Sequence, residues 1–313
     1  MEATELLKPK IDVVFHALFR EENNVLLEAM LSAILGKNIK IEANLDRHLN
    51  IATSEEKLGV MDLRVRFEDG TNCNIEIQLN SYSYENERFL YYLADTYSRQ
   101  LLRGKKYEEI NKTISIVIID HETEILKDME ELNIKWQMRD EKTGKRLLTD
   151  KFELVIIELP KAKRIYLSKN YDKTSQWMMF LDNPNSKEVI NIMDNNKDIK
   201  KASEALKQVS GDYELRRIAE LREKAIRDEQ AALDYAKVHG LKAGREEGLK
   251  QGLKEGLKQG HEEGFKQGRE EGIEQGIEIT AKNMLNLGVD LDIIIKATGL
   301  SKEQLLKLSS KNN

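Results

Sequence analysis

Two runs of alternating apolar and polar residues, joined by a short turn, limit the fold of this chain more than any other feature. Residues 61–67 read MDLRVRF and residues 73–79 read CNIEIQL, so apolar side chains recur at every second position. Alternation with period two over neighbouring runs is typical of two half-buried antiparallel strands. We therefore predict a β-hairpin with one face turned toward a core.

The turn between the two runs decides which residues face each other. A two-residue loop, Asp69-Gly70, places Asp62 opposite the apolar Ile77. A three-residue loop lets Gly70 take the left-handed conformation that this loop type needs, and it places Asp62 opposite Glu76. This second register keeps both faces of the hairpin uniform. We expect the two carboxylates to share a site, because opposed residues have Cβ atoms about 4.5–5.5 Å apart.

Two carboxylates at this spacing repel each other unless a cation lies between them. Oxygen ligands so placed suit Mg²⁺ or Mn²⁺, which are hard ions that bind through one or two carboxylates and retain waters. The alternative is a solvated polar face on which Arg64 or Arg66 relieves the repulsion. The hairpin by itself leaves both interpretations open.

The composition narrows the class of protein. The chain has 313 residues, 34% of them charged, and a net charge of −5, so any contact with nucleic acid must come from a local basic cluster. Its one cysteine, Cys73, excludes a disulfide framework, and its scattered histidines argue against a zinc site. No run of about 18 apolar residues and no signal-peptide pattern occur, so we expect a cytoplasmic protein with no membrane span.

The elements around the hairpin predict an α/β core of about 160 residues. They are two helices over 12–35 closed by Gly36, a short strand at 39–45, a helix from Ser83 to Gly104, a strand at 112–120, and a second hairpin formed by NIKWQMRD and FELVIIELP. Asp12 is a candidate N-cap of the first helix, and Ser83 of the later one. The continuous apolar run at 112–120 is typical of a strand that is buried on both faces.

The second half of the chain is helical in pattern, and within it glycine recurs at every fourth residue from 240 to 276. Each glycine inside a helix costs about 0.8–1 kcal/mol relative to alanine, so ten of them weigh against a lone helix. One interpretation is a solvated, flexible or partly helical tether. The other is self-association, because the glycines and the apolar residues that follow them form a winding stripe that another helix can approach closely.

The last residues form a separate small pattern. Residues 290–298 and 301–308 indicate two short helices joined by Gly299, and Ser301 with Gln304 makes a capping box. The arrangement is similar to a helix-turn-helix. Since the second helix carries few cations, a packing module and a base-reading module both remain open.

Several segments together resemble one known family. They are KIDVVFHALF near the start, MDLRV and GTNCNIEIQ in the hairpin, R-x-x-Y-Y and RQLLRGKKY after it, and VIIELPK at 155–161. This ordered set resembles the PD-(D/E)XK nuclease family transposases, also called the Rpn family of recombination-promoting nucleases. The resemblance covers residues 8 to about 240. It implies a restriction-endonuclease-like core, which is a mixed central sheet flanked by helices, followed here by an all-helical C-terminal extension.

The resemblance also implies roles for single residues. Asp62 matches the Asp of the motif and Glu76 matches the acid of (D/E)XK, so these two would bind Mg²⁺, with Mn²⁺ as a substitute. Gln78 stands where the family pattern usually has lysine, which removes a point charge and leaves a hydrogen-bonding amide. Asp12 resembles a family hallmark, although helix capping explains it without chemistry.

Basic and aromatic residues after the hairpin supply candidate contacts to DNA. Arg88 and Tyr92 lie on one side of a helix, where Arg88 either contacts a phosphate or pairs with Asp62 or Glu76. The remaining candidates, for which a solvated surface is the equal alternative, are Arg99, Arg103, Lys105 and Lys106.

These patterns lead to one expectation and its alternatives. We expect four regions, 1–165 (nuclease-like core), 166–239 (helical), 240–279 (glycine repeat) and 280–313 (helix-turn-helix-like tail). We expect a Mg²⁺-dependent DNA endonuclease of low sequence specificity, linked to recombination or mobile elements and forming a homo-oligomer through its C-terminal half. The alternatives are a non-catalytic oligomeric scaffold that retains the nuclease fold, and RNA as the substrate.

Overall fold

The computed structural model describes residues 5–45, 63–82, 84–101, 104, 106–168 and 172–310; for Ser309 and Ser310 it describes the backbone alone. The chain divides into two compact units, Met1–Ala232 and Leu233–Asn313. Four residues that the sequence singles out lie outside the described residues, namely Asp62, Ser83, Arg103 and Lys105.

A six-stranded sheet in the order β1-β2-β3-β4-β6-β5 forms the centre of the first unit. The strands are β1 (Ile41–Asn44), β2 (Leu63–Phe67), β3 (Asn72–Gln78), β4 (Thr113–Ile119), β5 (Asn133–Gln137) and β6 (Phe152–Glu158). β3, β4 and β6 run parallel to one another, whereas β1–β2, β2–β3 and β5–β6 are antiparallel pairs. The sheet is therefore mixed, and both predicted hairpins are confirmed.

Helices and short 3₁₀ turns connect these strands and follow them. In the first unit they are α1 (Asp12–Leu18), η1 (Glu21–Asn23), α2 (Asn24–Leu35), α3 (Glu85–Ser98), η2 (Tyr107–Glu109), η3 (Glu124–Leu126), α4 (Leu159–Leu167), α5 (Lys173–Asp182), α6 (Lys187–Asn195) and α7 (Lys197–Gly211). α8 (Tyr213–Asn286) begins in the first unit and continues into the second, where α9 (Leu291–Thr298) and α10 (Lys302–Ser310) follow. Within the described residues, every helix is too short or too polar to cross a membrane.

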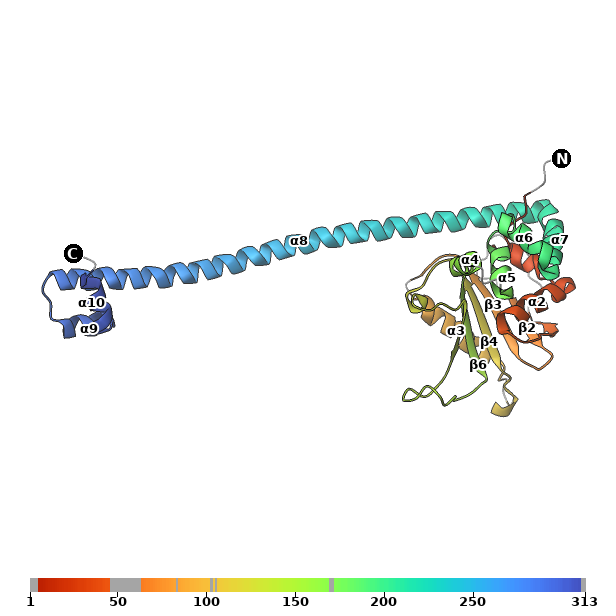
Figure 1. The fold of residues 1–313 in the computed structure, drawn as a ribbon, viewed down its shortest axis with the longest axis horizontal. Coiled ribbons are helices and arrows are strands. Elements are labelled where there is room, and N and C mark those ends of the chain that lie inside the picture. The colour runs from red at the N-terminus through yellow and green to blue at the C-terminus, as the bar shows by residue number, and fades with distance from the viewer. Residues whose placement is uncertain are drawn as a thin grey trace. The chain divides into compact units, whose positions relative to one another are not determined.

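Different helices cover the two faces of the sheet (Figure 1). On one face, apolar residues of α1, α2, α5 and α7 join a large core with Val65, Ile75 and Ile116. On the other face, Phe89 and Leu93 of α3 pack with alternate residues of β4 and β6 in a smaller cluster. The arrangement confirms the predicted α/β class.

The β2–β3 hairpin has the register that the three-residue loop predicts. Leu63 pairs with Ile75 and Arg64 pairs with Asn74. Gly70 has a φ of 80°, in the left-handed region, and the Phe67 amide donates to the Thr71 carbonyl at 2.9 Å to close the loop. The turn chemistry therefore fixes which face of each strand meets the core.

Two helix-end predictions have different outcomes. Asp12 is the first residue of α1 and Ile11 occupies the N-cap, so the prediction that Asp12 caps this helix is wrong; its carboxylate accepts instead from the next amide, that of Val13, at 2.8 Å. The predicted capping box is confirmed, because the Ser301 amide donates to Gln304 Oε1 at 2.8 Å and the Gln304 amide donates to Ser301 Oγ at 3.3 Å.

The second unit contains the glycine repeat and a small core. The repeat lies within α8, so it is helical, and the side chains of residues 227–276 are all exposed. Beyond the repeat, Ala281 packs with Ile294, Leu305 and Leu308 from α9 and α10. The tail thus forms a compact helical module around the end of α8.

Candidate active site

The polar residues of β3 lie on the face of the sheet that α3 covers. Asn74, Glu76 and Gln78 alternate with Cys73 and Ile75, which belong to the large core on the opposite face. Glu76 is 0% exposed and Gln78 is 5% exposed. A carboxylate is costly to bury unless charged or polar groups compensate it, so the neighbours of Glu76 decide what this face can do.

Arg88 of α3 is a cation that meets Glu76. Its Nη2 lies 3.4 Å from Glu76 Oε1. Its guanidinium also lies 5.5 Å from the ring centre of Tyr82 and 5.4 Å from that of Tyr92. Stacking on two aromatic faces holds a guanidinium in place and keeps its charge close to the carboxylate. The structure thus shows the alternative that the sequence left open for Arg88, a pairing with Glu76, and it places Tyr92 and Tyr82 beside the guanidinium.

Each hairpin arginine lies opposite an asparagine of β3. Arg66 Nε donates to Asn72 Oδ1 at 3.2 Å, across the β2–β3 pair. Arg64 lies opposite Asn74, two positions from Glu76 along β3. Part of the positive charge that compensates Glu76 therefore comes from Arg88 on α3, which lies outside the hairpin sequence.

Several buried polar atoms on this face have hydrogen-bonding capacity to spare. The Gln78 amide nitrogen donates to the Asn80 carbonyl at 3.1 Å, but Gln78 Oε1 accepts no hydrogen bond from the described residues. The same holds, within that part of the chain, for the side-chain amide of Asn74 and for Ser115 Oγ on β4. Buried polar atoms are nearly always paired, so such a cluster indicates a place for water, an ion or a ligand.

The donor set fits a hard divalent cation in part. Glu76 offers a carboxylate and Gln78 an amide oxygen, and both atom types suit Mg²⁺. Among the described residues no group of three or more His, Cys, Asp or Glu side chains forms a metal-binding cluster. Asp62, the second predicted ligand, lies outside the described residues, so its position opposite Glu76 stays a prediction.

His121 and Glu85 form a pair that sequence reasoning missed. His121 comes two residues after β4 and Glu85 opens α3, and the His121 Nε2 atom lies 2.7 Å from Glu85 Oε2. Both side chains are mostly buried. The sequence contained part of the signal, because a histidine just beyond a buried strand lies at the carboxyl end of that strand. The parallel pairing of β3 and β4 then places it beside the carboxyl end of β3.

Lys10 and Asp12 lie in ion pairs with residues distant in the sequence. Asp12 Oδ2 is 3.7 Å from the Arg222 Nε of α8. The Lys10 ammonium contacts Asp120 and Asp182 at 2.7 Å each. Burial lowers the pKa of Lys10, but hydrogen bonds and charges from these two carboxylates outweigh it, so the pKa lies above its ordinary value. The observed contacts of Asp12 are thus with its own helix and with α8.

The other predicted DNA contacts lie outside this cluster or outside the described residues. Arg99 is exposed and pairs with Asp95, one helical turn earlier, at 2.6 Å. Lys106 is exposed next to η2. Arg103 and Lys105 belong to the part of the chain that the structure does not describe.

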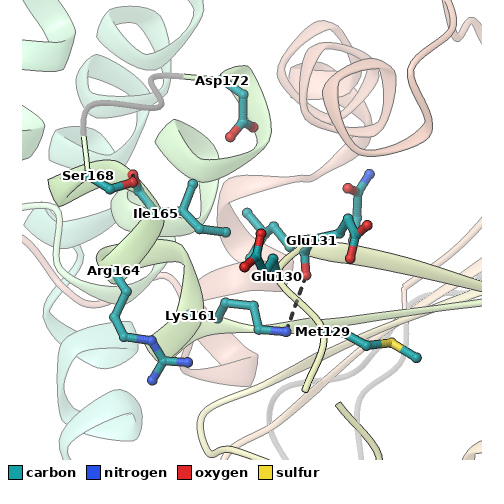
Figure 2. Close-up of a pocket in the computed structure, with 10 residues that line it drawn as sticks. Met129, Glu130, Glu131, Lys161, Arg164, Ile165, Ser168 and Asp172 are labelled. Carbon is teal, nitrogen blue, oxygen red and sulfur yellow. Dashed lines mark hydrogen bonds between the residues drawn. The ribbon is translucent and has the colours of Figure 1, made fainter. Parts of the chain in front are cut away.

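A groove of about 610 Å³ elsewhere in the first unit has its cations already engaged. Figure 2 shows Lys161 and Arg164 of α4 on one wall and Glu130 and Glu131 opposite. The Lys161 ammonium donates to two carbonyls and lies 3.7 Å from the buried Glu158, while Arg164 pairs with Glu122. The ELPK segment, residues 158–161, therefore stabilises the fold at this groove.

Comparison with known families agrees with the geometry of β3 and α3. A family model described as PD-(D/E)XK nuclease family transposase matches residues 9–236. This chain belongs to that family. A second model, described as Rpn/YhgA-like nuclease family, C-terminal HTH domain, matches residues 274–310 of this PD-(D/E)XK protein. Neither the curated proteins nor the solved structures gave a match.

Membership confirms the resemblance that the sequence motifs carry, and with it the restriction-endonuclease-like fold. The first match runs from α1 through the start of α8, so it includes the helices that follow the sheet. The second match covers the end of α8 with α9 and α10, and its HTH description agrees with the arrangement of the two short helices in the tail. The chain is thus a member of a nuclease family with an HTH module after its glycine repeat.

Proposed function

We propose that this PD-(D/E)XK protein is a divalent-metal-dependent endonuclease that nicks or cleaves DNA with little sequence specificity. Its activity is linked to recombination or mobile elements. The observation that carries the proposal is the buried Glu76–Gln78 pair on β3, faced by Arg88, in a chain that belongs to a nuclease family. DNA as the partner is supported by the HTH match of the tail.

Each residue of the site has a role in this proposal. Glu76 and Asp62 would hold Mg²⁺ or Mn²⁺. When bound, such an ion activates water for in-line attack and offsets the charge of the phosphodiester. Gln78 orients the water or the phosphate through its amide, since it cannot supply the positive charge of a lysine. Arg88 exchanges part of its contact with Glu76 for a bidentate contact with the phosphate.

The decisive experiment is nicking of supercoiled plasmid by the full-length protein with Mg²⁺, with Mn²⁺ and with chelator. We expect metal-dependent nicking that Glu76→Ala and Asp62→Ala each reduce by a factor of about 10²–10³, by analogy with the loss of one well-placed group in other active sites. Glu153→Ala is the matched control, because Glu153 is a buried strand glutamate that pairs with Lys112 on another part of the sheet.

Two results would contradict the proposal. Nicking that is unchanged in Glu76→Ala would remove this residue from the chemistry. Absence of nicking with either metal would favour the rival function, a non-catalytic scaffold that retains the nuclease fold. Repeating the assay with single-stranded RNA separates the two nucleic acids as substrates.

We also propose that the protein is a homo-oligomer through the glycine-repeat part of α8. Leu249, Leu253 and Leu257 are each at least 65% exposed there. A Cβ added to any repeat glycine meets nothing within 4 Å, so the glycine row is an open groove beside an apolar ridge. Ridges and grooves at four-residue spacing are the elements of the commonest helix packing class. A second copy of α8 supplies both.

The distribution of charge along the repeat supports a second copy as the partner. Residues 240–259 contain five basic and three acidic residues, whereas residues 260–279 contain two basic and six acidic residues. Two antiparallel copies bring the basic half of each repeat against the acidic half of the other. Complementary charges favour that alignment over a parallel one in register.

A further inference from the structure

The segment that follows β3 is hydrogen-bonded to a residue far away in the sequence. Glu229 of α8 accepts a hydrogen bond from Asn80 Nδ2 at 2.7 Å and another from the Tyr82 hydroxyl at 3.0 Å. Both donors belong to the connection between β3 and α3, which begins directly after Gln78. Glu229 therefore joins the first turns of α8 to the segment that links the two elements of the site.

One branch of this contact leads to Gln78. Asn80 is 5% exposed, and its backbone carbonyl accepts the hydrogen bond of the Gln78 amide nitrogen at 3.1 Å. This hydrogen bond orients the Gln78 amide, whose buried Oε1 accepts no hydrogen bond from the described residues. Fixing the Asn80 side chain from α8 thus limits the motion of the residue that orients Gln78.

The other branch leads to Glu76. The Tyr82 ring lies 5.5 Å from the Arg88 guanidinium, and Arg88 Nη2 lies 3.4 Å from Glu76 Oε1. Burial raises the pKa of Tyr82, and its hydrogen bond with the Glu229 carboxylate and that group's charge raise it further. The Tyr82 hydroxyl therefore stays a neutral donor to Glu229 while its ring faces Arg88.

We infer that Glu229 is a positioning residue for this site, acting through Asn80 on Gln78 and through Tyr82 and Arg88 on Glu76. The inference rests on the proposed nuclease function and assigns α8, as far as Glu229, to the nuclease machinery. Glu229 is exposed on its helix, and each of its oxygens is engaged by one of the two loop residues. It acts on the reaction through geometry, since these contacts leave the reacting atoms to other groups.

The test uses plasmid nicking by the full-length protein at saturating Mn²⁺ or Mg²⁺. Glu229→Ala removes both hydrogen bonds, and we expect the nicking rate to fall about tenfold, the change that corresponds to roughly one misplaced hydrogen bond in the transition state. Glu229→Gln should stay within about threefold of the wild type, because an amide accepts from Asn80 and donates to the Tyr82 oxygen. Glu220→Ala, an exposed glutamate earlier on α8, is the control and should not change the rate.

A second measurement follows the hydrogen bond between Glu229 and Tyr82 without relying on nuclease activity. The ionisation of Tyr82 is obtained as the difference between the ultraviolet pH titrations of the wild type and Tyr82→Phe. Both Glu229→Ala and Glu229→Gln should lower the pKa of Tyr82, because both remove the carboxylate charge. Glu220→Ala should leave this titration where it is in the wild type.

The outcomes separate this inference from the function on which it rests. If the wild type nicks and Glu229→Ala nicks equally fast, the positioning role is overturned and the nuclease proposal stands. A slow Glu229→Ala protein whose Tyr82 titration has not moved, or that Glu229→Gln does not rescue, also overturns it. If the wild type fails to nick with either metal, the nuclease proposal fails and the positioning role fails with it.

Discussion

At the scale of single residues, Arg88 contributes to compensating the charge of the buried Glu76 carboxylate. Its guanidinium lies near two tyrosine rings and 3.4 Å from Glu76. A lysine has the same charge, but its ammonium is a compact, strongly hydrated group without the planar face that stacks on aromatic rings. The identity of the cation therefore matters as well as its charge.

We predict that Arg88→Lys lowers the free energy of unfolding by about 1 kcal/mol, which is the scale of the lost stacking with Tyr82 and Tyr92. The same change should slow nicking by about tenfold, because lysine cannot contact a phosphate bidentately. Urea unfolding and plasmid nicking measure the two effects. Arg217→Lys is the control, since Arg217 is exposed on α8 and pairs with Glu214, and an equal loss there would refute a special role for Arg88.

Residues close together in the sequence were predictable, and those brought together by the fold were not. Alternation over β2 and β3 and a glycine in the turn sufficed to place Glu76 and Gln78 on one face. Arg88 and Tyr92 followed from helical spacing. Glu229 meets Asn80 and Tyr82 across about 150 residues, and no local periodicity carries that information.

At the scale of elements, the β2–β3 turn fixes the register on which the site depends. Gly70 has a φ of 80°, and a Cβ at this position meets Asn111 Oδ1 at 3.4 Å. We predict that Gly70→Ala lowers the free energy of unfolding by about 1–2 kcal/mol, the cost of a left-handed residue that has a side chain. Gly211→Ala at the end of α7, where φ is not positive and the added Cβ meets nothing, should be neutral or stabilising by up to about 1 kcal/mol. Denaturant unfolding of both proteins distinguishes turn geometry from a general effect of alanine.

The stabilisation that Asp69 gives this turn depends on pH. Asp69 Oδ1 accepts from the Thr71 amide at 2.9 Å, and Oδ2 pairs with Lys37 at 3.2 Å. Burial raises the pKa of Asp69, but the Thr71 hydrogen bonds and the Lys37 charge outweigh it, so the pKa lies below its ordinary value. A depressed pKa in the folded state means that the stabilisation is present above the unfolded value of about 3.9 and is lost as the pH falls through the folded value.

We therefore predict that Asp69→Asn is less stable than the wild type near neutral pH and that the difference shrinks below about pH 4. The free energy of unfolding, measured from about pH 6 to about pH 3, tests the sign. Asp150→Asn, in an exposed position of the β5–β6 connection, is the control. A difference that grows toward acid pH would contradict the contacts of Asp69.

At the scale of the whole molecule, the glycine repeat is the feature that the sequence left most open. A lone exposed helix with ten glycines is unfavourable by the propensity of its residues, yet α8 is continuous through them. Periodicity in the sequence showed that the glycines and apolar residues share a winding stripe. It did not show whether another helix covers the stripe, because an exposed helix and an associating one share this periodicity.

Alanine at three repeat glycines separates an isolated helix from an associating one. Gly252→Ala, Gly256→Ala and Gly260→Ala together should stabilise a lone helix by about 2.5–3 kcal/mol from propensity. They also fill the open groove, where a second helix would need the space. If the proposed homo-oligomer forms through this groove, the triple variant becomes more helical by circular dichroism and yet sediments as a smaller species. Gln251→Ala, Gln259→Ala and Gln267→Ala, in the same repeat, leave both the glycine groove and the charges of the repeat unchanged and serve as the control. A triple glycine variant that keeps the sedimentation of the wild type would show that another surface, or none, joins the copies.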